Sequence, residues 1–323
     1  MIEINKKLTS TRGGFGEAML EVAAINPQVV ALSADLTESL RLTKFAEQYP
    51  GRFIQVGIAE QNMIGVAAGL AIQGKIPFAT SFAVFSPGRT WEQIRDSVCY
   101  SDLPVIIVGG HTGLNVGEDG YTQQGLEDLA LMQVLPNMTV ISPADFYETK
   151  KAVHALANLK KPAYLRLTRE KTTDVTHSDS PFEIGKANII QEGSDLTIIG
   201  TGPILANVKE AMTKLQNRYS IEIVNVHTLK PFDTETVLDS LKKTKSFITI
   251  EEHQLFGGLA TALTTALAKD QITSQLLSLP HQFLGLNDYF GESGTAQVLW
   301  KKHGLDSSSI SKTIEQTIGR KNA

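Results

Sequence analysis

Short apolar runs rich in β-branched residues alternate along this chain with longer segments in which apolar residues recur at helical spacing. In the first half the runs have the length of buried strands, and they lie at 29–34, 52–57, 77–82, 104–110 and 138–143. Helical spacing is found between or after them, at 59–74, 88–102, 125–135 and 144–159. Parallel strands need crossover helices of this kind, so the pattern predicts repeated right-handed βαβ units.

The alternation lapses over residues 172–195 into a polar stretch containing Ser, Asp and Gly, a composition typical of a domain junction. It then resumes, with strands expected at 196–202, 221–229 and 246–253. We therefore predict an α/β fold in two parts. A parallel-sheet domain covers residues 1–187, and a smaller α/β domain covers residues 188–323.

Composition narrows the class of function. The 323 residues are 42% hydrophobic, enough for a sizeable core, and 30 Lys and Arg against 34 Asp and Glu leave a net charge of -4. This balance offers no electrostatic footprint for nucleic acid or an anionic membrane. The opening residues MIEINKKLTS hold no apolar stretch, and no run of about 18 apolar residues occurs, so we expect a cytoplasmic protein that acts on small molecules.

The single cysteine, Cys99, excludes an internal disulfide and a zinc site built from two cysteines of this chain. It lies in IRDSVCY, which has helical apolar spacing, so a buried structural thiol is favoured over a nucleophile. We likewise expect a structural role for His253 and a scaffolding or interface role for the region around it.

Candidate chemistry lies just after the strands, where open parallel sheets bind their ligands. Asp35 follows the first strand, Glu60 the second and His111 the fourth, and the loop 116–125 combines three glycines with Glu118 and Asp119. Glu60 opens a helix, where a carboxylate is favoured but is also an ordinary first-turn cap.

Purely structural roles for these residues remain open on the sequence pattern alone. The GEDG sequence also suits a simple turn, and Phe82 and Phe85 also suit the core. The residues alone therefore predict an α/β enzyme with a carboxylate-rich cleft and do not name its reaction.

A resemblance to a known family goes further. The segments RFIQVGIAEQNMIGVAAGLA (52–71), TSFAVFSPGRTWEQIRDSV (80–98) and the run from His111 to Asp145 resemble the pyrimidine-binding domain of transketolases. The segments VHTLKPFD (226–233), EEHQLFGGL (251–259) and FGESGTAQVL (290–299) are similar to the carboxy-terminal domain of that family. The resemblance covers nearly the whole chain and implies an enzyme that depends on thiamine diphosphate.

Full-length members hold the diphosphate and its metal through a Gly-Asp-Gly motif, and no Gly-Asp-Gly occurs in this sequence. The resemblance therefore implies a split transketolase with a second, amino-terminal subunit. That partner would hold the diphosphate and Mg²⁺ or a similar divalent ion, so we expect no metal ligands on this chain. Because the family places its cofactor sites at subunit interfaces, we expect two copies of each chain.

The resemblance also implies roles for individual residues toward the cofactor. Glu60 matches the glutamate that hydrogen-bonds a ring nitrogen of the aminopyrimidine and favours its imino tautomer. Phe82 and Phe85 match aromatic residues around that ring, and Asp35 matches a residue near the thiazolium. A third family aromatic is Gly88 here, so we expect this wall to be looser or to be filled by another residue such as Trp91.

Further positions match the family's substrate site. The clamp for an anionic sugar terminus corresponds to Arg12, Ser39, His111 and Arg169. Guanidinium, imidazole and hydroxyl donors suit a phosphate, and a sulfonate would fit nearly as well. Asp119 matches an aspartate that contacts a substrate hydroxyl. Gln123 departs from the family, which has a histidine there, and glutamine cannot titrate near neutral pH.

We therefore expect transfer of a two-carbon ketol unit from a ketose phosphate, or from a sulfonated or branched ketose, to an aldose. Two alternatives remain. One is a related thiamine enzyme, either a deoxyxylulose-phosphate synthase or the β subunit of a 2-oxo-acid dehydrogenase. The other is a non-catalytic remnant that only binds partners.

Overall fold

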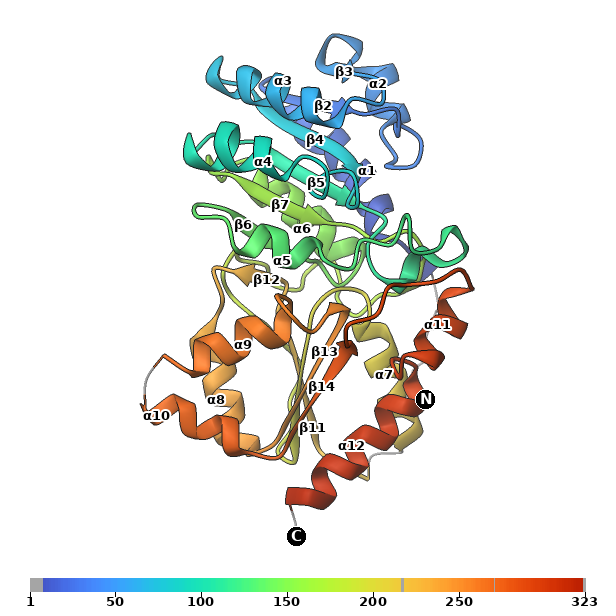
Figure 1. Ribbon diagram of the computed structural model, residues 1–323, viewed down its shortest axis with the longest axis vertical. Helices are drawn as coiled ribbons and strands as arrows, with labels where there is room; N and C mark the ends of the chain where they lie inside the picture. Colours follow the sequence, from blue (N-terminus) through green and yellow to red (C-terminus); the bar gives the residue numbers. More distant parts are fainter. Residues whose placement is uncertain (1–7, 216–217, 270, 322–323) are drawn as a thin grey trace.

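The computed structural model describes residues 8–215, 218–269 and 271–321. Residues 1–7 lie outside them, so most of the opening segment MIEINKKLTS, in which the sequence shows no apolar stretch, is not described. Two central sheets organise the chain, one above the other in Figure 1. In the described residues no helix combines the length and the apolar character that crossing a membrane requires.

The first sheet has seven strands in the order β12-β6-β7-β5-β4-β2-β3. Six are parallel, with bounds Val29–Ser33 (β2), Phe53–Gln55 (β3), Ile76–Phe82 (β4), Ile106–Gly110 (β5), Thr139–Ile141 (β6) and Ala163–Arg166 (β7). The sequence predicted the first five of these strands and missed β7. The strands β2 and β5 are buried throughout, which explains why they are continuous apolar runs without alternation.

Helices cover both faces of this sheet. One face packs against α1 (Thr11–Ile25), α2 (Thr43–Gln48) and α6 (Phe146–Leu156) in a buried cluster that includes Phe15, Met19 and Val153. The other face packs against α3 (Glu60–Ile72), α4 (Trp91–Gln93), η2 (Ile94–Tyr100) and α5 (Asp128–Gln133). Cys99 lies in this second cluster, and burial raises the pKa of its thiol to about 11, so the predicted buried thiol is confirmed.

The segment predicted as one helix over 88–102 has a different geometry. It begins only at Trp91 and widens after Gln93 into a π-helical turn. The preceding Gly88 lies so close to the chain that a Cβ atom there would be 2.3 Å from the carbonyl oxygen of Val84. The backbone thus turns tightly between Phe82 and the helix, and only glycine fits that approach.

The second sheet has five strands in the order β14-β13-β10-β11-β9. Their bounds are Asn188–Gln191 (β9), Leu196–Gly200 (β10), Ile221–Asn225 (β11), Phe247–Gln254 (β13) and His281–Leu286 (β14). β9 is antiparallel to β11, and the other pairs are parallel. The predicted boundary near residue 188 falls at the start of β9 and stays a prediction.

Helices also surround this sheet, and short elements complete the chain. The helices are α7 (Leu205–Leu215), α8 (Thr234–Thr244), α9 (Leu259–Leu267), α10 (Gln271–Ser274), η4 (Gln275–Ser278), α11 (Ala296–Lys302) and α12 (Ser307–Lys321). The short elements are η1 (Pro50–Arg52), η3 (Leu114–Asp119) and the antiparallel pair β1 (Leu8–Thr9) with β8 (Thr172–Thr173).

The two halves share both strands and core. The expected strand at 221–229 is in fact two strands, because β11 ends at Asn225 and β12 (Thr228–Lys230) joins the first sheet antiparallel to β6. The backbone N–H of Ser142 also donates to the carbonyl oxygen of His227, at 2.8 Å. One buried cluster contains Leu129 and Met132 from the first half with Val224 and Phe247 from the second. The halves are therefore packed as one body.

Candidate active site

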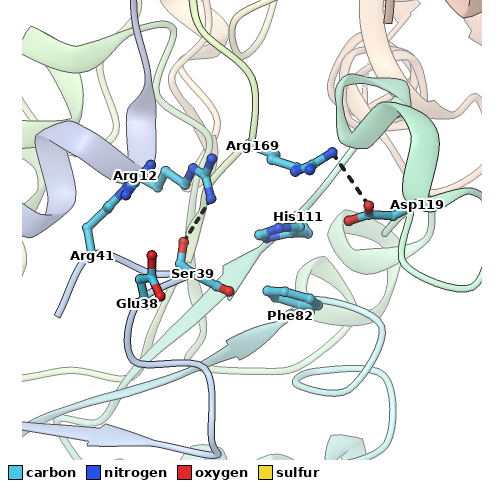
Figure 2. Close-up of a pocket in the computed structure, with 8 residues that line it drawn as sticks. All are labelled: Arg12, Glu38, Ser39, Arg41, Phe82, His111, Asp119 and Arg169. Carbon is cyan, nitrogen blue, oxygen red and sulfur yellow. Dashed lines mark hydrogen bonds and ion pairs between the residues drawn. The ribbon is translucent and has the colours of Figure 1, made fainter. Parts of the chain in front are cut away.

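A pocket of about 370 Å³ opens beyond the carboxyl ends of neighbouring parallel strands, where ligands bind in open α/β sheets (Figure 2). Phe82 ends β4, His111 follows β5, and Arg169 lies three residues after β7. The full lining is Arg12, Glu38, Ser39, Arg41, Phe82, His111, Asp119 and Arg169. The structure thus brings together five of the six residues predicted for the substrate.

Arg12 lies at the start of α1, whose first turn is capped by the Ser10 hydroxyl accepting from the Gly13 N–H at 3.2 Å. Its Nη1 donates to the carbonyl oxygen of Ser39 at 3.1 Å, while its Nε is buried with no hydrogen-bond partner among the described atoms. Burial lowers the pKa of Arg12, and the nearby Arg41 and Arg169 lower it further. Three arginines, Arg12, Arg41 and Arg169, face the carboxylates of Glu38 and Asp119 in this lining, so a net positive charge remains that an anion would relieve.

Arg169 lies across the pocket from Arg12. Its Nη1 donates to the carbonyl oxygen of Val116 at 2.8 Å and is 3.6 Å from a carboxylate oxygen of Asp119. Figure 2 shows this ion pair on one side of His111, with Arg12 and Arg41 on the other. The pocket offers guanidinium groups on opposing walls, an arrangement suited to a tetrahedral oxyanion.

His111 forms the base of the pocket together with Phe82. Its ring stacks on Phe82, with the ring centroids 3.6 Å apart, and only 3% of the residue is exposed. Burial lowers the pKa of His111 to about 3, helped by the charges of Arg12 and Arg169, so the imidazole is neutral at pH 7. Its Nδ1 is buried and has no partner among the described atoms. It can therefore exchange a hydrogen bond with a ligand, and it does so without a charge.

Glu60 begins α3 and is buried, with 3% of the residue exposed. Its Oε2 accepts a hydrogen bond from Arg89 Nη1 at 2.8 Å, and the guanidinium carbon of Arg89 lies 5.0 Å from the ring centroid of Phe85. The rings of Phe82 and Phe85 are 6.0 Å apart and only 18° from parallel. The planar guanidinium of Arg89 thus donates a hydrogen bond to Glu60 and lies over the ring of Phe85.

This arrangement tests whether an aminopyrimidine would fit. The guanidinium of Arg89 is planar, donates N–H to a buried carboxylate and covers an aromatic ring, as a protonated aminopyrimidine would. The side chain of Arg89 is half exposed, so it can move into solvent and free Glu60 for another partner. The residues present therefore suit the group, and Glu60, Phe82 and Phe85 would hold it.

Four of the predicted site residues are not in the pocket lining: Glu60 and Phe85, described above, and Asp35 and Gln123. Asp35 is exposed, has a left-handed backbone (φ 60°) and donates its N–H to Gln55 Oε1 at 2.8 Å. Gln123 is partly buried in a turn in which its N–H donates to the carbonyl oxygen of Gly120 at 3.0 Å. The roles predicted for both residues stay predictions.

Other residues at the site were missed by the sequence reasoning. Arg41 and Glu38 line the pocket, and Arg89 contacts Glu60. Arg41 is two residues from Ser39, and Arg89 is next to Gly88. Their closeness in sequence to positions already assigned to the site is the one sequence feature that could have indicated them. Trp91, which the resemblance suggested could fill the pocket wall, donates its indole N–H to the carbonyl oxygen of Leu131 at 2.9 Å, and its role toward the cofactor stays a prediction.

Comparisons with known proteins agree with this geometry. Residues 7–174 match the family described as the pyrimidine binding domain of transketolase, and residues 185–310 match the transketolase C-terminal domain. The chain belongs to the transketolase family. The sequence resemblance is thereby confirmed, and so is the mixed α/β fold class.

Individual relatives of transketolase type span the same length. A putative transketolase C-terminal section from Methanocaldococcus jannaschii is 43% identical over 97% of this chain and 98% of its own length. A 6-deoxy-6-sulfo-D-fructose transketolase subunit from Clostridium sp. (strain MSTE9) is 37% identical over 96% and 95%. A solved structure described as a split gene transketolase, an inactive beta4 tetramer, has 40% identity and a TM-score of 0.87, covering 97% of this chain and 99% of that one. This transketolase chain therefore corresponds to a carboxy-terminal section.

Proposed function

We propose that this chain is the carboxy-terminal subunit of a two-chain transketolase that moves a two-carbon ketol unit from an anionic ketose to an aldose. The observation that carries the proposal is the adjacency of two sites. The arginine-lined pocket ends at Phe82, and the same ring faces Phe85, which lies beside the Glu60 and Arg89 pair. A donor bound by its anionic end would thus extend toward the cofactor site.

Thiamine diphosphate, which this family uses, supplies the carbon nucleophile and the electron sink for ketol transfer when it is bound. Glu60 would hold the ring nitrogen, and its buried position keeps water from competing for that bond. Phe82 and Phe85 would support the ring, and Asp35 would face the thiazolium side. For this to happen Arg89 has to release Glu60, and its half-exposed side chain leaves it room to do so.

The partner in this proposal is an amino-terminal transketolase subunit that holds the diphosphate and Mg²⁺ or a similar ion, in an assembly with two copies of each chain. The similar split-gene chain described as an inactive beta4 tetramer supports a requirement for a second subunit. We place the complex in the cytoplasm, and we keep the boundary near residue 188 between its two domains.

The donor in this proposal carries a phosphate or a sulfonate. Arg12, Arg41 and Arg169 surround the pocket, while His111 is neutral and acts as a hydrogen-bonding partner. Similarity to a sulfofructose transketolase subunit supports the sulfonate. Asp119 would accept a hydrogen bond from a donor hydroxyl, and Gln123 replaces a titratable histidine with an amide that holds its hydrogen bonds at every pH.

The test is reconstitution. We would co-express this chain with the product of the neighbouring gene, add thiamine diphosphate and Mg²⁺, and measure ketol transfer from phosphorylated and sulfonated ketoses, with each chain alone as the control. Transfer only in the mixture is the expected result. Turnover of pyruvate instead would favour a synthase or dehydrogenase, and cofactor binding without transfer from any donor would favour a binding-only remnant.

Glu60→Gln is the matched variant for the cofactor role. It keeps the shape and buried position of the side chain but cannot exchange a proton with the ring nitrogen, so ketol transfer is expected to fall by about 100-fold or more. The control is Glu92→Gln, a carboxylate on the neighbouring helix α4. Undiminished partner-dependent transfer in Glu60→Gln would disprove the catalytic assignment.

A further inference from the structure

The loop that carries Asp119 is held by the second half of the chain. We define the Asp119 loop as residues 113–125, which contain η3 and Gln123. Its two ends are pinned together, because the Gly113 N–H donates to the carbonyl oxygen of Gly125 at 2.9 Å. Between these ends the loop packs against β13 and against the segment that precedes α11.

Glu252, on β13, is the central contact. It is 2% exposed, and its Oε1 accepts hydrogen bonds from the backbone N–H of Asn115 at 2.9 Å and from the indole N–H of Trp300 at 2.6 Å. Gly113 has a left-handed backbone (φ 77°), and a Cβ atom there would lie 3.0 Å from the Cβ of Glu252. The start of the loop therefore rests directly on this side chain.

From Asn115 the contacts continue to the pocket. The side-chain Oδ1 of Asn115 accepts from the N–H of Glu170 at 2.6 Å, and Asn115 is fully buried. The next residue of the loop, Val116, accepts from Arg169 Nη1 through its carbonyl oxygen at 2.8 Å. One buried carboxylate thus fixes the backbone that places both Arg169 and Asp119.

A second contact holds the far end of the loop. Gln124 is buried, and its Nε2 donates to the carbonyl oxygen of Glu292 at 3.0 Å. Gly291 makes this approach possible, since a Cβ atom there would lie 1.6 Å from Gln124 Oε1. At Gly120 a Cβ atom would lie 2.4 Å from the hydroxyl of Ser293. Small residues on both sides let the two backbones meet.

We propose that the second half of the chain positions the Asp119 loop for the donor, with Glu252 as the positioning residue and residues 291–294 as a second support. This rests on the proposed function in one respect, namely that Asp119 and Arg169 contact the donor. It gives the smaller half a defined role in substrate selection.

The chemistry of Glu252 suggests a conservative variant. Burial raises the pKa of Glu252, and its Oε2 has no hydrogen-bond partner among the described atoms. A neutral carboxyl keeps Oε1 as the acceptor for both N–H groups, and the amide oxygen of glutamine can do the same. Glu252→Gln should therefore preserve the loop, whereas Glu252→Ala should release it.

The first measurement is amide hydrogen exchange in this chain alone, followed by mass spectrometry. Exchange in residues 113–125 should be about tenfold faster or more in Glu252→Ala and within about threefold of the original protein in Glu252→Gln, as expected for loss of one buried hydrogen bond. Unchanged exchange in Glu252→Ala would overturn the proposal.

Glu251→Ala is the control. Glu251 is the preceding residue of β13, is equally buried, and accepts from the N–H groups of Leu259 and Ala260 at 2.6 and 2.9 Å. Its loss should lower the Tm while leaving exchange in the Asp119 loop unchanged. Equal release of the loop in Glu251→Ala would show that the loop only reports general stability, and would also overturn the proposal.

The second measurement is kinetic, in the reconstituted enzyme with its partner. Glu252→Ala should raise the donor KM about tenfold with a smaller change in kcat, and Glu252→Gln should keep the original KM.

If Glu252→Ala does not fold, Gly291→Ala is the substitute. Its methyl group would clash with the side chain of Gln124 and so push the far end of the loop away from residues 291–294. A released loop with an unchanged donor KM overturns the positioning role. Absence of ketol transfer in the original protein would instead count against the proposed function, while the exchange data would still decide how the loop is held.

Discussion

At the scale of single residues, burial and neighbouring charges set the protonation of the arginine-lined pocket. Burial and two neighbouring arginines lower the pKa of Arg12, and burial together with Arg12 and Arg169 lowers the pKa of His111. The pocket therefore holds its positive charge on guanidinium groups, which do not lose their proton in proteins, and keeps its imidazole neutral. An anionic ligand would complete the balance.

His111 gives a prediction for pH dependence. Its folded pKa of about 3 lies below the unfolded value near 6.5, so between these values the unfolded chain binds the extra proton and the free energy of unfolding falls as pH falls. At pH 5 this costs about 2 kcal/mol. In His111→Gln the loss of stability between pH 7 and pH 5, measured by urea unfolding, should be smaller by about that amount.

Two other buried histidines do not confuse this comparison. Burial lowers the pKa of His227 and of His253 to about 4, and both are present in the original protein and the variant. Their contributions cancel in the difference. An identical pH dependence in the two proteins would mean that the pKa of His111 is the same in the folded and the unfolded chain, and would contradict this prediction.

The pair of Glu60 and Arg89 gives a second prediction, for the protein without cofactor. Arg89→Ala leaves a buried carboxylate without this partner and should lower the free energy of unfolding by about 1–2 kcal/mol, a modest value because Arg89 is half exposed. In a Glu60→Gln background the same change should cost less than about 0.5 kcal/mol. Additive effects in this double-mutant cycle, measured by urea unfolding, would refute the coupling.

At the scale of elements, close helix packing places Arg12. α1 lies against α6, and a Cβ atom at Gly14 would be 2.4 Å from the carbonyl oxygen of Phe146. α6 is itself held by its cap, Asp145, which accepts from the N–H of Glu148 at 3.0 Å and of Val175 at 2.8 Å. The position of Arg12 thus depends on a backbone contact that only glycine permits.

Two adjacent glycines of α1 test this dependence. Gly14→Ala should lower the free energy of unfolding by about 1–3 kcal/mol, because the methyl group meets backbone, and should raise the donor KM by shifting Arg12. Gly13→Ala is the control. Its methyl group would meet the Ser10 hydroxyl at 3.2 Å and otherwise only ring atoms at 3.8 Å or more, so the effect should stay within about 0.5 kcal/mol. Equal effects, measured by thermal unfolding, would contradict the packing argument.

At the scale of the whole molecule, the two halves form one structural unit. β12 belongs by sequence to the second half but completes the first sheet, and one buried cluster combines residues of both halves. A second cluster does the same, joining Leu114 and Leu126 to Ile198 and Trp300. Neither half has a complete core by itself.

We therefore predict that the chain unfolds in a single cooperative transition, which calorimetry would detect as one peak with equal van't Hoff and calorimetric enthalpies. Residues 1–187 expressed alone should lack a cooperative transition, because they lose β12 and the side of the core that contains Val224 and Phe247. Two resolved peaks for the full chain would show that the halves are independent.

The sequence by itself determined the alternation of strands and helices, the burial of Cys99 and the family. These follow from local periodicity and short motifs, because a buried strand or an amphipathic helix records its own burial in adjacent residues. It also located six of the eight residues that line the pocket, all but Glu38 and Arg41, through the family motifs. Periodicity alone would have left Glu60 as a helix cap and Phe82 as a core residue.

Only the tertiary structure decided the remainder. The crossing of β12 into the first sheet, the contact of Arg89 with Glu60, and the support of Asn115 by Glu252, 137 residues away, are set by the register and packing of distant elements. No local pattern records such contacts, because each partner looks by itself like an ordinary surface arginine, turn asparagine or buried strand residue. The chemistry of this protein thus depends on residues that can be read from the sequence, but their contact partners are determined by the tertiary structure.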